Sequence, residues 1–352
     1  MKCYPLKLSA HVRSYSFGGR LLVDELGKKN MPDGIVAETW EISDYKDTTG
    51  TVENGAYAGR KLRELVAEFP DELVGKGWRG PHFPLLEKFL DANTMLPVHL
   101  HADDATAKCK YCEPNGKTEA WHILWAAPGA TILAGTHTHN RSDLFNAFKK
   151  QDYDAVIPRL PIKSGDTIYV PAGVLHSFGP DTVVFEVQQT SDLAVTVMPT
   201  DIYGKPHDVS VWEHNINETL DEMRDHPNPT PNQGLARKNG TNKITVCCAG
   251  PYFAMERWAL TETHKEPAHE HRCLTLTGIN GDVTIKYDGA SETLPKGVSC
   301  IIPAGIGEFS VVPQNGSAEL IACYVPNLDD DIRKHLKDAG HSAEAISSLG
   351  EL

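Results

Sequence analysis

His99-Leu100-His101, followed by Gly165-Asp166 and then by Val170-Pro171-Ala172-Gly173-Val174-Leu175-His176, is the series of short runs that decides the fold. A looser copy comes later in the chain: His269-Glu270-His271, Lys296-Gly297 and Ile302-Pro303-Ala304-Gly305-Ile306-Gly307-Glu308. The two series keep the same order and similar residue types, as an internal duplication does. The sequence therefore predicts two copies of one small β-barrel.

The sequence around these runs is built from short β-type segments. The 23 Pro and 29 Gly residues are spread along the chain and separate segments of Val, Ile, Leu and aromatic residues, which is typical of a mainly β protein. Expected strands are 83–91, 96–101, 121–126, 130–134, 166–170, 183–188, 193–198, 243–248, 253–260, 273–277, 282–287, 298–303 and 319–325. Helical spacing occurs only at 61–68, 142–150, 212–225 and 329–339, with Ser142 as the expected cap of the second helix.

A run rich in turn-forming residues separates the two halves. Residues 225–234 contain three Pro and form neither a regular helix nor a central strand. We therefore expect a first domain at 1–225 with the functional site, a linker at 226–240, and a second domain at 241–352 with a terminal helix. Because the second half has Glu308 where the first has His176, we expect it to be degenerate and structural.

Composition restricts the partners. The chain has 352 residues, with 34 Lys and Arg against 47 Asp and Glu and a formal net charge of −13. This acidic balance argues against nucleic acid or an anionic membrane as the main partner. No apolar run is long enough to span a membrane or to resemble a signal peptide. Eight Cys are too few for a disulfide scaffold, so we expect a cytoplasmic protein that binds a small molecule.

Four side chains have the types and positions of metal ligands. His99 and His101 project to one side of a strand, Glu119 comes directly before an apolar strand, and His176 ends the Pro-Ala-Gly loop. Three imidazoles and one carboxylate suit one zinc ion per chain, with manganese, iron or cobalt as alternatives. The competing interpretation is a set of ordinary surface or hydrogen-bonded histidines, since the chain has 16.

The order of these runs resembles the cupin jelly roll, in two copies that cover nearly the whole chain. The first half more specifically resembles the class I mannose-6-phosphate isomerases, in the short form that lacks a large helical insertion. The matching stretches keep the family's order: Ala37–Ser43, Phe83–Ala92, Leu96–Asp104, Gly116–Trp121, Tyr169–His176 and Glu186–Asp192. The resemblance implies a mainly β fold of two cupin-type jelly-roll barrels with a few short helices.

The same resemblance implies an activity and roles for residues. The activity is interconversion of an aldose and a ketose, mannose 6-phosphate and fructose 6-phosphate, through a cis-enediol. The metal ligands would be His99, at the family's Gln position, together with His101, Glu119 and His176. Lys117 would face the sugar as a catalytic cation or proton-transfer group, and His101 or a metal-bound water is a further candidate base. Additional substrate contacts are expected from Trp40, Glu41, Asp104, Trp121 and His122.

Two departures from the family pattern keep other functions open. Pro97 stands where the family has a Ser, and Thr196 stands where it has an Arg, so a charged clamp for phosphate is missing there. The substrate could then be a different or unphosphorylated sugar. Another cupin chemistry and an inactive sugar-binding protein are the remaining alternatives. The pair Cys109 and Cys112 fits either a redox motif or a solvent-facing loop, and the sequence leaves the oligomeric state open.

Overall fold

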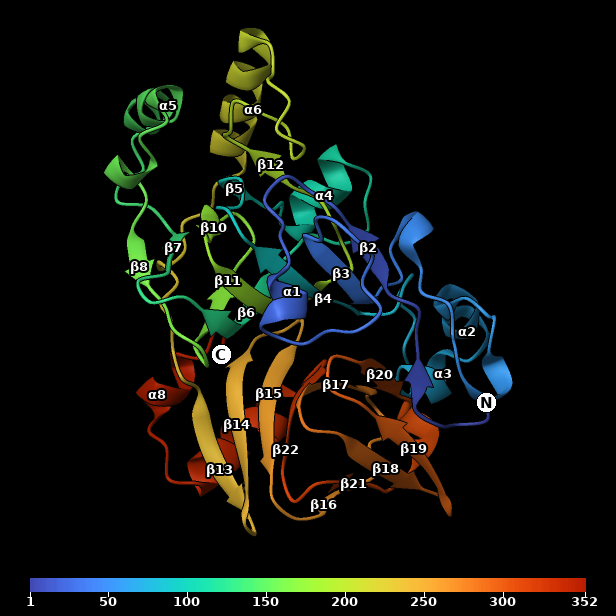
Figure 1. Ribbon diagram of the computed structural model, residues 1–352. Helices are drawn as coiled ribbons and strands as arrows, with labels where there is room; N and C mark the ends of the chain where they lie inside the picture. The colour runs from blue at the N-terminus through green and yellow to red at the C-terminus, as the bar shows by residue number, and fades with distance from the viewer. The chain divides into compact units, whose positions relative to one another are not determined.

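The structure, a computed structural model, describes residues 1–352. The chain forms two compact units (Figure 1). Unit 1 consists of residues 1–11, 40–88 and 233–352, and unit 2 of residues 12–39 and 89–232. Three of the divisions between them fall within strands β2 (His11–Arg13), β3 (Glu38–Ile42) and β4 (Leu85–Ala92), and the fourth follows Asn232. The predicted domains at 1–225 and 241–352, with a linker at 226–240, stay a prediction.

Unit 2 is built on antiparallel strands. One sheet has the order β12 (Val195–Thr196), β5 (His99–Leu100), β10 (His176–Phe178), β7 (Thr131–Ala134) and β8 (Arg159–Pro161). Opposite it, β11 (Thr182–Gln189) pairs with β6 (Glu119–Ala126), which pairs with β9 (Thr167–Val170). The helical segments are α1 (Leu21–Asp24), α4 (Asp104–Lys110), α5 (Arg141–Lys150), the 3-10 turn Tyr153–Ala155 and α6 (Val209–Glu222).

Unit 1 contains a seven-stranded and a four-stranded antiparallel sheet. The larger has the order β1 (Leu6–Lys7), β20 (Ser299–Ile302), β17 (Leu274–Asn280), β22 (Ala318–Tyr324), β15 (Ala254–Leu260), β14 (Asn242–Ala249) and β13 (Leu235–Asn239). The smaller has the order β16 (His264–Glu266), β21 (Phe309–Pro313), β18 (Val283–Tyr287) and β19 (Ala290–Leu294). The buried core of unit 1 includes the strand residues Ile244, Trp258, Leu276 and Leu320.

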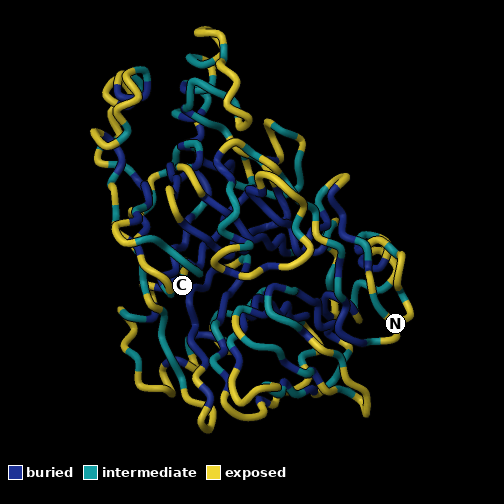
Figure 2. The backbone as a smooth tube through the Cα atoms, viewed as in Figure 1, coloured by how far each residue is buried: buried dark blue, intermediate teal, exposed yellow.

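Short helical segments complete unit 1. They are the 3-10 turns Lys46–Thr48, Gly55–Tyr57 and Ala304–Ile306, helices α2 (Leu62–Glu68) and α3 (Pro70–Leu73), the π-helical segment Leu328–Arg333, and helices α7 (Lys334–Asp338) and α8 (Ala343–Ser347). In Figure 2 the strands are mostly buried and the connecting loops exposed. None of the helices has both the length and the apolar character needed to span a lipid bilayer.

The prediction of a mainly β fold with few short helices is confirmed. Several short elements were not predicted, among them strands β8, β10 and β21 and helix α4, and other differences lie at the ends of elements. The expected strand at 96–101 is ordered as a strand only at His99–Leu100. Helix α5 begins at Arg141, because the Asn140 side chain accepts hydrogen bonds from the amides of Ser142 (2.9 Å) and Asp143 (3.1 Å). Asn140, and not the expected Ser142, is therefore the cap.

A buried acid in unit 1 makes the stability of this fold depend on pH. Glu87, on β4, is fully buried and accepts a hydrogen bond from the Thr275 hydroxyl on β17. Burial raises the pKa of Glu87 from 4.5 to about 8, because water no longer solvates its charged form. Between these two values the folded chain keeps a proton that the unfolded chain has lost.

We predict that the free energy of unfolding falls as the pH rises from 5 to 8, by about 1.4 kcal/mol per pH unit from this residue alone. Glu87→Gln should remove that part of the slope, since its side chain does not titrate. Urea titrations at several pH values measure the slope. Glu319→Gln, a substitution on β22 of a side chain one-third exposed, is the control and should keep the slope of the parent. An equal slope in the parent and Glu87→Gln would contradict the prediction.

Candidate metal centre

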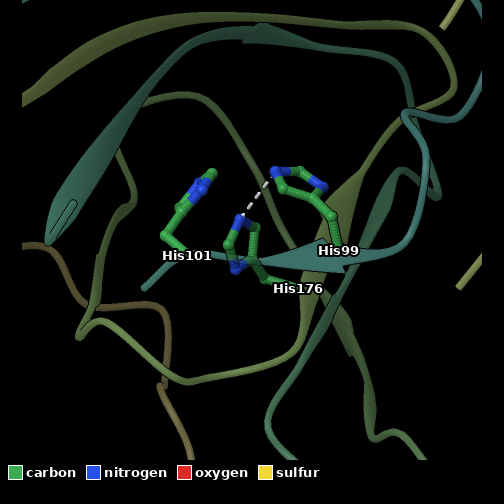
Figure 3. Close-up of side chains that lie close together, drawn as sticks. All are labelled: His99, His101 and His176. Atoms are coloured by element: carbon green, nitrogen blue, oxygen red, sulfur yellow. Dashed lines mark hydrogen bonds between the residues drawn. The ribbon is translucent and has the colours of Figure 1, made fainter. Parts of the chain in front are cut away.

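Three imidazole rings converge inside unit 2 (Figure 3). His99 on β5 lies directly opposite His176 on the neighbouring strand β10, and their Nε2 atoms are 3.0 Å apart. His101 follows two residues after His99, and its ring centroid is 4.8 Å from each of the other two. One ligand atom from each ring lies within 4.8 Å of the others. The two sequence-distant His runs therefore meet at one point.

The alternation of side chains along each strand explains why the histidines point inward. Leu100 and Leu175, the neighbours of these His residues in sequence, belong to a different core cluster. That cluster includes Phe148 of α5 and Ile216 of α6. Because successive side chains on a strand face opposite sides, packing the leucines under the two helices turns the imidazoles to the other face.

Backbone carbonyls fix the orientation of each ring. The Nδ1 atoms of His99, His101 and His176 lie 2.7, 2.7 and 2.8 Å from the carbonyl oxygens of Pro97, Leu193 and Val174. A carbonyl only accepts, so each Nδ1 carries the hydrogen and each Nε2 presents a lone pair to the centre. This is the arrangement found in histidines that bind metals.

A carboxylate completes the group. Glu119 is the first residue of β6. Its Oε2 lies 3.2 Å from His101 Nε2, and its Oε1 lies 3.3 Å from His176 Nε2. The Lys117 ammonium lies 2.9 Å from Glu119 Oε2 and 3.8 Å from Glu186 Oε1. All of these side chains except that of His99 are at least nine-tenths buried. The centre thus combines neutral nitrogen donors, two carboxylates and one fixed cation.

Burial and charge set the protonation states. Burial lowers the pKa of all three histidines, that of His176 to about 3, so the rings are neutral near pH 7. Burial alone would raise the pKa of Glu119, but the Lys117 ammonium outweighs it and holds that pKa well below its ordinary value. The group therefore offers an ionised carboxylate and three unprotonated Nε2 atoms, the forms that a metal ion requires.

These residues fit a divalent metal ion. The Nε2 lone pairs of His99 and His176 face each other at 3.0 Å, and no hydrogen is available to join them. A cation placed among three such nitrogens and a carboxylate offsets this repulsion. Three nitrogens and one oxygen are a donor set that suits zinc and other borderline divalent ions.

The turn that carries Lys117 is held tightly. The amide of Gly116 donates to Asp104 Oδ1 (2.7 Å), and the amide of Lys117 donates to the carbonyl of Ala102 (3.0 Å). A Cβ on Gly116 would lie 2.5 Å from that same carbonyl oxygen, so only glycine allows this approach. Asp104 also accepts from the Gln189 side chain (3.0 Å). Asp104 thus positions the turn before Lys117, and its contact with a substrate stays a prediction.

The other predicted substrate contacts lie in different surroundings. Trp121 is buried on β6 on the same face as Glu119, with its ring 5.2 Å from that of His176. His122 lies on the opposite face of β6 and contacts the Thr167 hydroxyl at 2.8 Å, so the fold does not bring it to the three histidines. Trp40 and Glu41 belong to unit 1, where Trp40 packs under the Lys88 ammonium. Their contact with a substrate stays a prediction.

Sequence reasoning missed Glu186 as a site residue. It lies on β11 opposite Trp121, and its carboxylate is the second one near the Lys117 ammonium. The signal was present in the sequence, because Glu186 interrupts the apolar run Val183-Val184-Phe185-Glu186-Val187. A buried charge in a central strand is costly unless it is paired, and such a residue is a candidate for function.

The remaining candidate motifs do not join this centre. Cys109 and Cys112 are exposed free thiols. In the second half, His269 is hydrogen-bonded to Glu266 and Glu308 is exposed. Neither pair forms part of the His99, His101 and His176 cluster.

Two antiparallel sheets that enclose histidines and a glutamate define the class of this protein, a cupin. Family models support the assignment on both halves: the catalytic domain of type I phosphomannose isomerase matches residues 6–124, and the mannose-6-phosphate isomerase cupin domain matches residues 243–325. Mannose-6-phosphate isomerase of Streptococcus mutans is 30% identical over 327 residues, which cover 91% of this chain and 98% of that protein. The chain belongs to the type I mannose-6-phosphate isomerase family.

Solved structures agree with this assignment. The mannose 6-phosphate isomerase from Bacillus subtilis superposes with a TM-score of 0.80 at 28% identity, covering 91% of this chain and 99% of that one. A structure of phosphomannose isomerase from Salmonella typhimurium, 15% identical, shares the fold with a TM-score of 0.72 and coverage of 91% and 99%. The predicted cupin fold and family are therefore confirmed.

We predict that the purified chain takes up about one divalent ion, and that His101→Ala and Glu119→Gln each lose most of it, because each removes one donor. Elemental analysis by mass spectrometry measures the ion per chain. A chelator should lower the unfolding temperature of the parent and leave that of His101→Ala unchanged, since the ion stabilises only the folded state.

His122→Ala is the matched control, because it removes a buried imidazole from the same unit on the other face of β6. It should keep the metal content of the parent. Equal metal content in His101→Ala and His122→Ala would contradict the assignment of the centre.

Proposed function

We propose that this chain is a metal-dependent isomerase that interconverts mannose 6-phosphate and fructose 6-phosphate through a cis-enediol. The observation that carries the proposal is the Lys117 ammonium, fixed 2.9 Å from Glu119 beside three inward-facing histidines. Membership of the mannose-6-phosphate isomerase family supports both the reaction and the substrate. Zinc is the proposed ion, held by His99, His101, Glu119 and His176, and when bound it supplies electrostatic polarisation of the sugar oxygens.

Lys117 has the position of a catalytic cation. In the isomerisation a base removes the proton from C2 and the proton returns at C1, so negative charge develops on the oxygens of the intermediate. An ammonium held between Glu119 and Glu186 stabilises that charge without a rearrangement of its own. Lys117 and His101 are the proposed proton-transfer groups, and the geometry supports Lys117 more, because His101 Nδ1 donates to the carbonyl of Leu193 and its Nε2 is a proposed metal ligand.

We predict that Lys117→Met lowers kcat by about a hundredfold or more while the metal content stays near that of the parent, because all four ligands remain. The measurement is incorporation of deuterium from heavy water into mannose 6-phosphate and fructose 6-phosphate, followed by NMR. Lys163→Met, which removes an exposed lysine in the same unit, is the control and should label at the parent rate.

The outcome separates the proposed functions. If the parent protein binds the sugar phosphate but no deuterium enters C1 or C2 of the sugar, the protein is a sugar-binding protein and not an isomerase. Consumption of oxygen by an iron-loaded protein would indicate a different cupin chemistry.

Recognition of a free sugar is the second candidate, and two residues favour it. Thr196 is on β12 and lies opposite His99 of β5. Its hydroxyl donates to the carbonyl of Val98 (3.0 Å). The carbonyl of Pro97 accepts from His99 Nδ1. Both residues are engaged in holding the strand of His99, and neither carries a charge that would bind a phosphate.

We predict that Thr196→Arg lowers the KM for mannose 6-phosphate by about tenfold and leaves the KM for mannose unchanged, because a guanidinium there adds a charged donor for the phosphate. Thr196→Gln, which has a long side chain without charge, is the control. Steady-state kinetics with both sugars measures the effect. A parent enzyme that prefers mannose over mannose 6-phosphate would favour the second candidate.

The free cysteines, five of them buried, support a reducing compartment such as the cytoplasm as the proposed location.

A further inference from the structure

We infer that unit 1 contains a second ligand site, which binds a small metabolite through a carboxylate or phosphate group. A cavity of about 700 Å³ is lined by residues 74–78, 84, 268–273, 325–327, 330 and 331, all of them in unit 1. This volume is in the range of small-molecule sites. The site is made of residues different from those of the metal centre and does not depend on the proposed isomerase activity.

Arg272 lines this cavity and is held in a fixed orientation. Its guanidinium stacks on the ring of Tyr324, with Cζ 3.8 Å from the ring centroid. The hydroxyl of Tyr324 in turn donates to Glu256 (3.0 Å). Arg272 Nε lies 3.6 Å from Asp331, and the side chain is 13% exposed. A stacked, mostly buried guanidinium loses little conformational freedom when it binds an anion.

Two nitrogens of Arg272 retain donors for a ligand. Nη1 is buried and has no hydrogen-bond partner within the chain. Nη2 lies 3.3 Å from His269 Nε2, but that nitrogen is also 2.9 Å from Glu266 Oε1. The protonation state of Glu266 decides whether His269 Nε2 donates to Glu266 or accepts from Arg272.

Glu266 takes the hydrogen of His269. Although burial acts to raise it, hydrogen bonds from His264 and His269 lower the pKa of Glu266 to about 2, so the carboxylate is ionised and accepts from both rings. His269 Nε2 therefore donates to Glu266 and does not accept from Arg272. The guanidinium thus presents Nη1 and Nη2 together, and such a pair of parallel donors matches two oxygens of a carboxylate or phosphate.

Other residues of the cavity agree with an anionic group attached to a larger skeleton. Trp78 also lines the cavity, and its Nε1 is buried with no hydrogen-bond partner in the chain. Lys76, with a side chain 68% exposed, adds a cation. The lining contains three acids, and each has a partner in the chain. Asp330 and Asp331 accept hydrogen bonds from Asn327, and Glu270 lies 3.9 Å from the Lys76 ammonium. The volume exceeds the size of one oxyanion and leaves room for several carbon atoms.

Isothermal titration of the full-length chain with inorganic phosphate and with citrate tests the site and distinguishes the two anion classes. We expect at least one of them to bind, and Arg272→Met to raise its Kd by about tenfold or more. Trp78→Phe, which keeps an aromatic ring and removes Nε1–H, should raise the Kd by a few fold. Arg79→Met is the matched control: Arg79 is adjacent to Trp78, pairs with Asp71 and does not line the cavity. It should bind as the parent does.

Three results would overturn the site. They are no binding of either anion by the parent at millimolar concentration, binding by Arg272→Met equal to that of the parent, and binding that is lost in Lys117→Met but kept in Arg272→Met. The last would place the anion at the metal centre. If Arg272→Met does not fold, as judged by circular dichroism, Trp78→Phe decides, and a Kd equal to that of the parent then counts against the site.

Discussion

Three hydrogen bonds to backbone carbonyls are the constraint on which the functional centre depends. Because the carbonyls of Pro97, Val174 and Leu193 each hold an Nδ1–H, all three Nε2 lone pairs face one small volume. Such an arrangement is unfavourable without a cation, since buried acceptors lose water and gain no donor. This convergence of the three Nε2 atoms is maintained by the strands and by the leucines packed under α5 and α6. The fixed turn before Lys117 also contributes to it. The metal centre is therefore a property of the backbone as much as of its ligands.

The charges around the centre also explain why a lysine, Lys117, is buried there. Glu119 and Glu186 bring two negative charges into a buried region, and Lys117 compensates one of them. With neutral imidazoles the group has a net charge of about −1, which a divalent ion changes to about +1. A site of that charge favours an intermediate with negative charge on its oxygens. Removing Lys117 would thus change both the local charge and the stabilisation of the intermediate.

Much of this could be predicted from the sequence, for reasons of spacing. The interval between His99 and His101 places both on one face of a strand, and runs of Val, Ile and Leu indicated most strands. What could not be predicted depends on long-range contacts. Strand β10 is three residues long and exists because it pairs along its whole length with β7 and, at His176, with His99 of β5. The opposite orientation of His122 follows from the same alternation, but only the pairing of β6 with Thr167 on β9 reveals what it contacts.

The second half contains two histidines whose ring nitrogens have partners within the chain. There Asn239 donates to His264 Nδ1 (3.1 Å), so the hydrogen of that ring is on Nε2, the reverse of the tautomer found in the first half. His264 Nε2 then donates to Glu266 at 2.9 Å, and His269 does the same. The carboxylate is satisfied by two N–H groups, and no lone pairs are left facing one another. Because these histidines need no ion, the region can instead use Arg272 for an anion, and units 1 and 2 can serve different ligands.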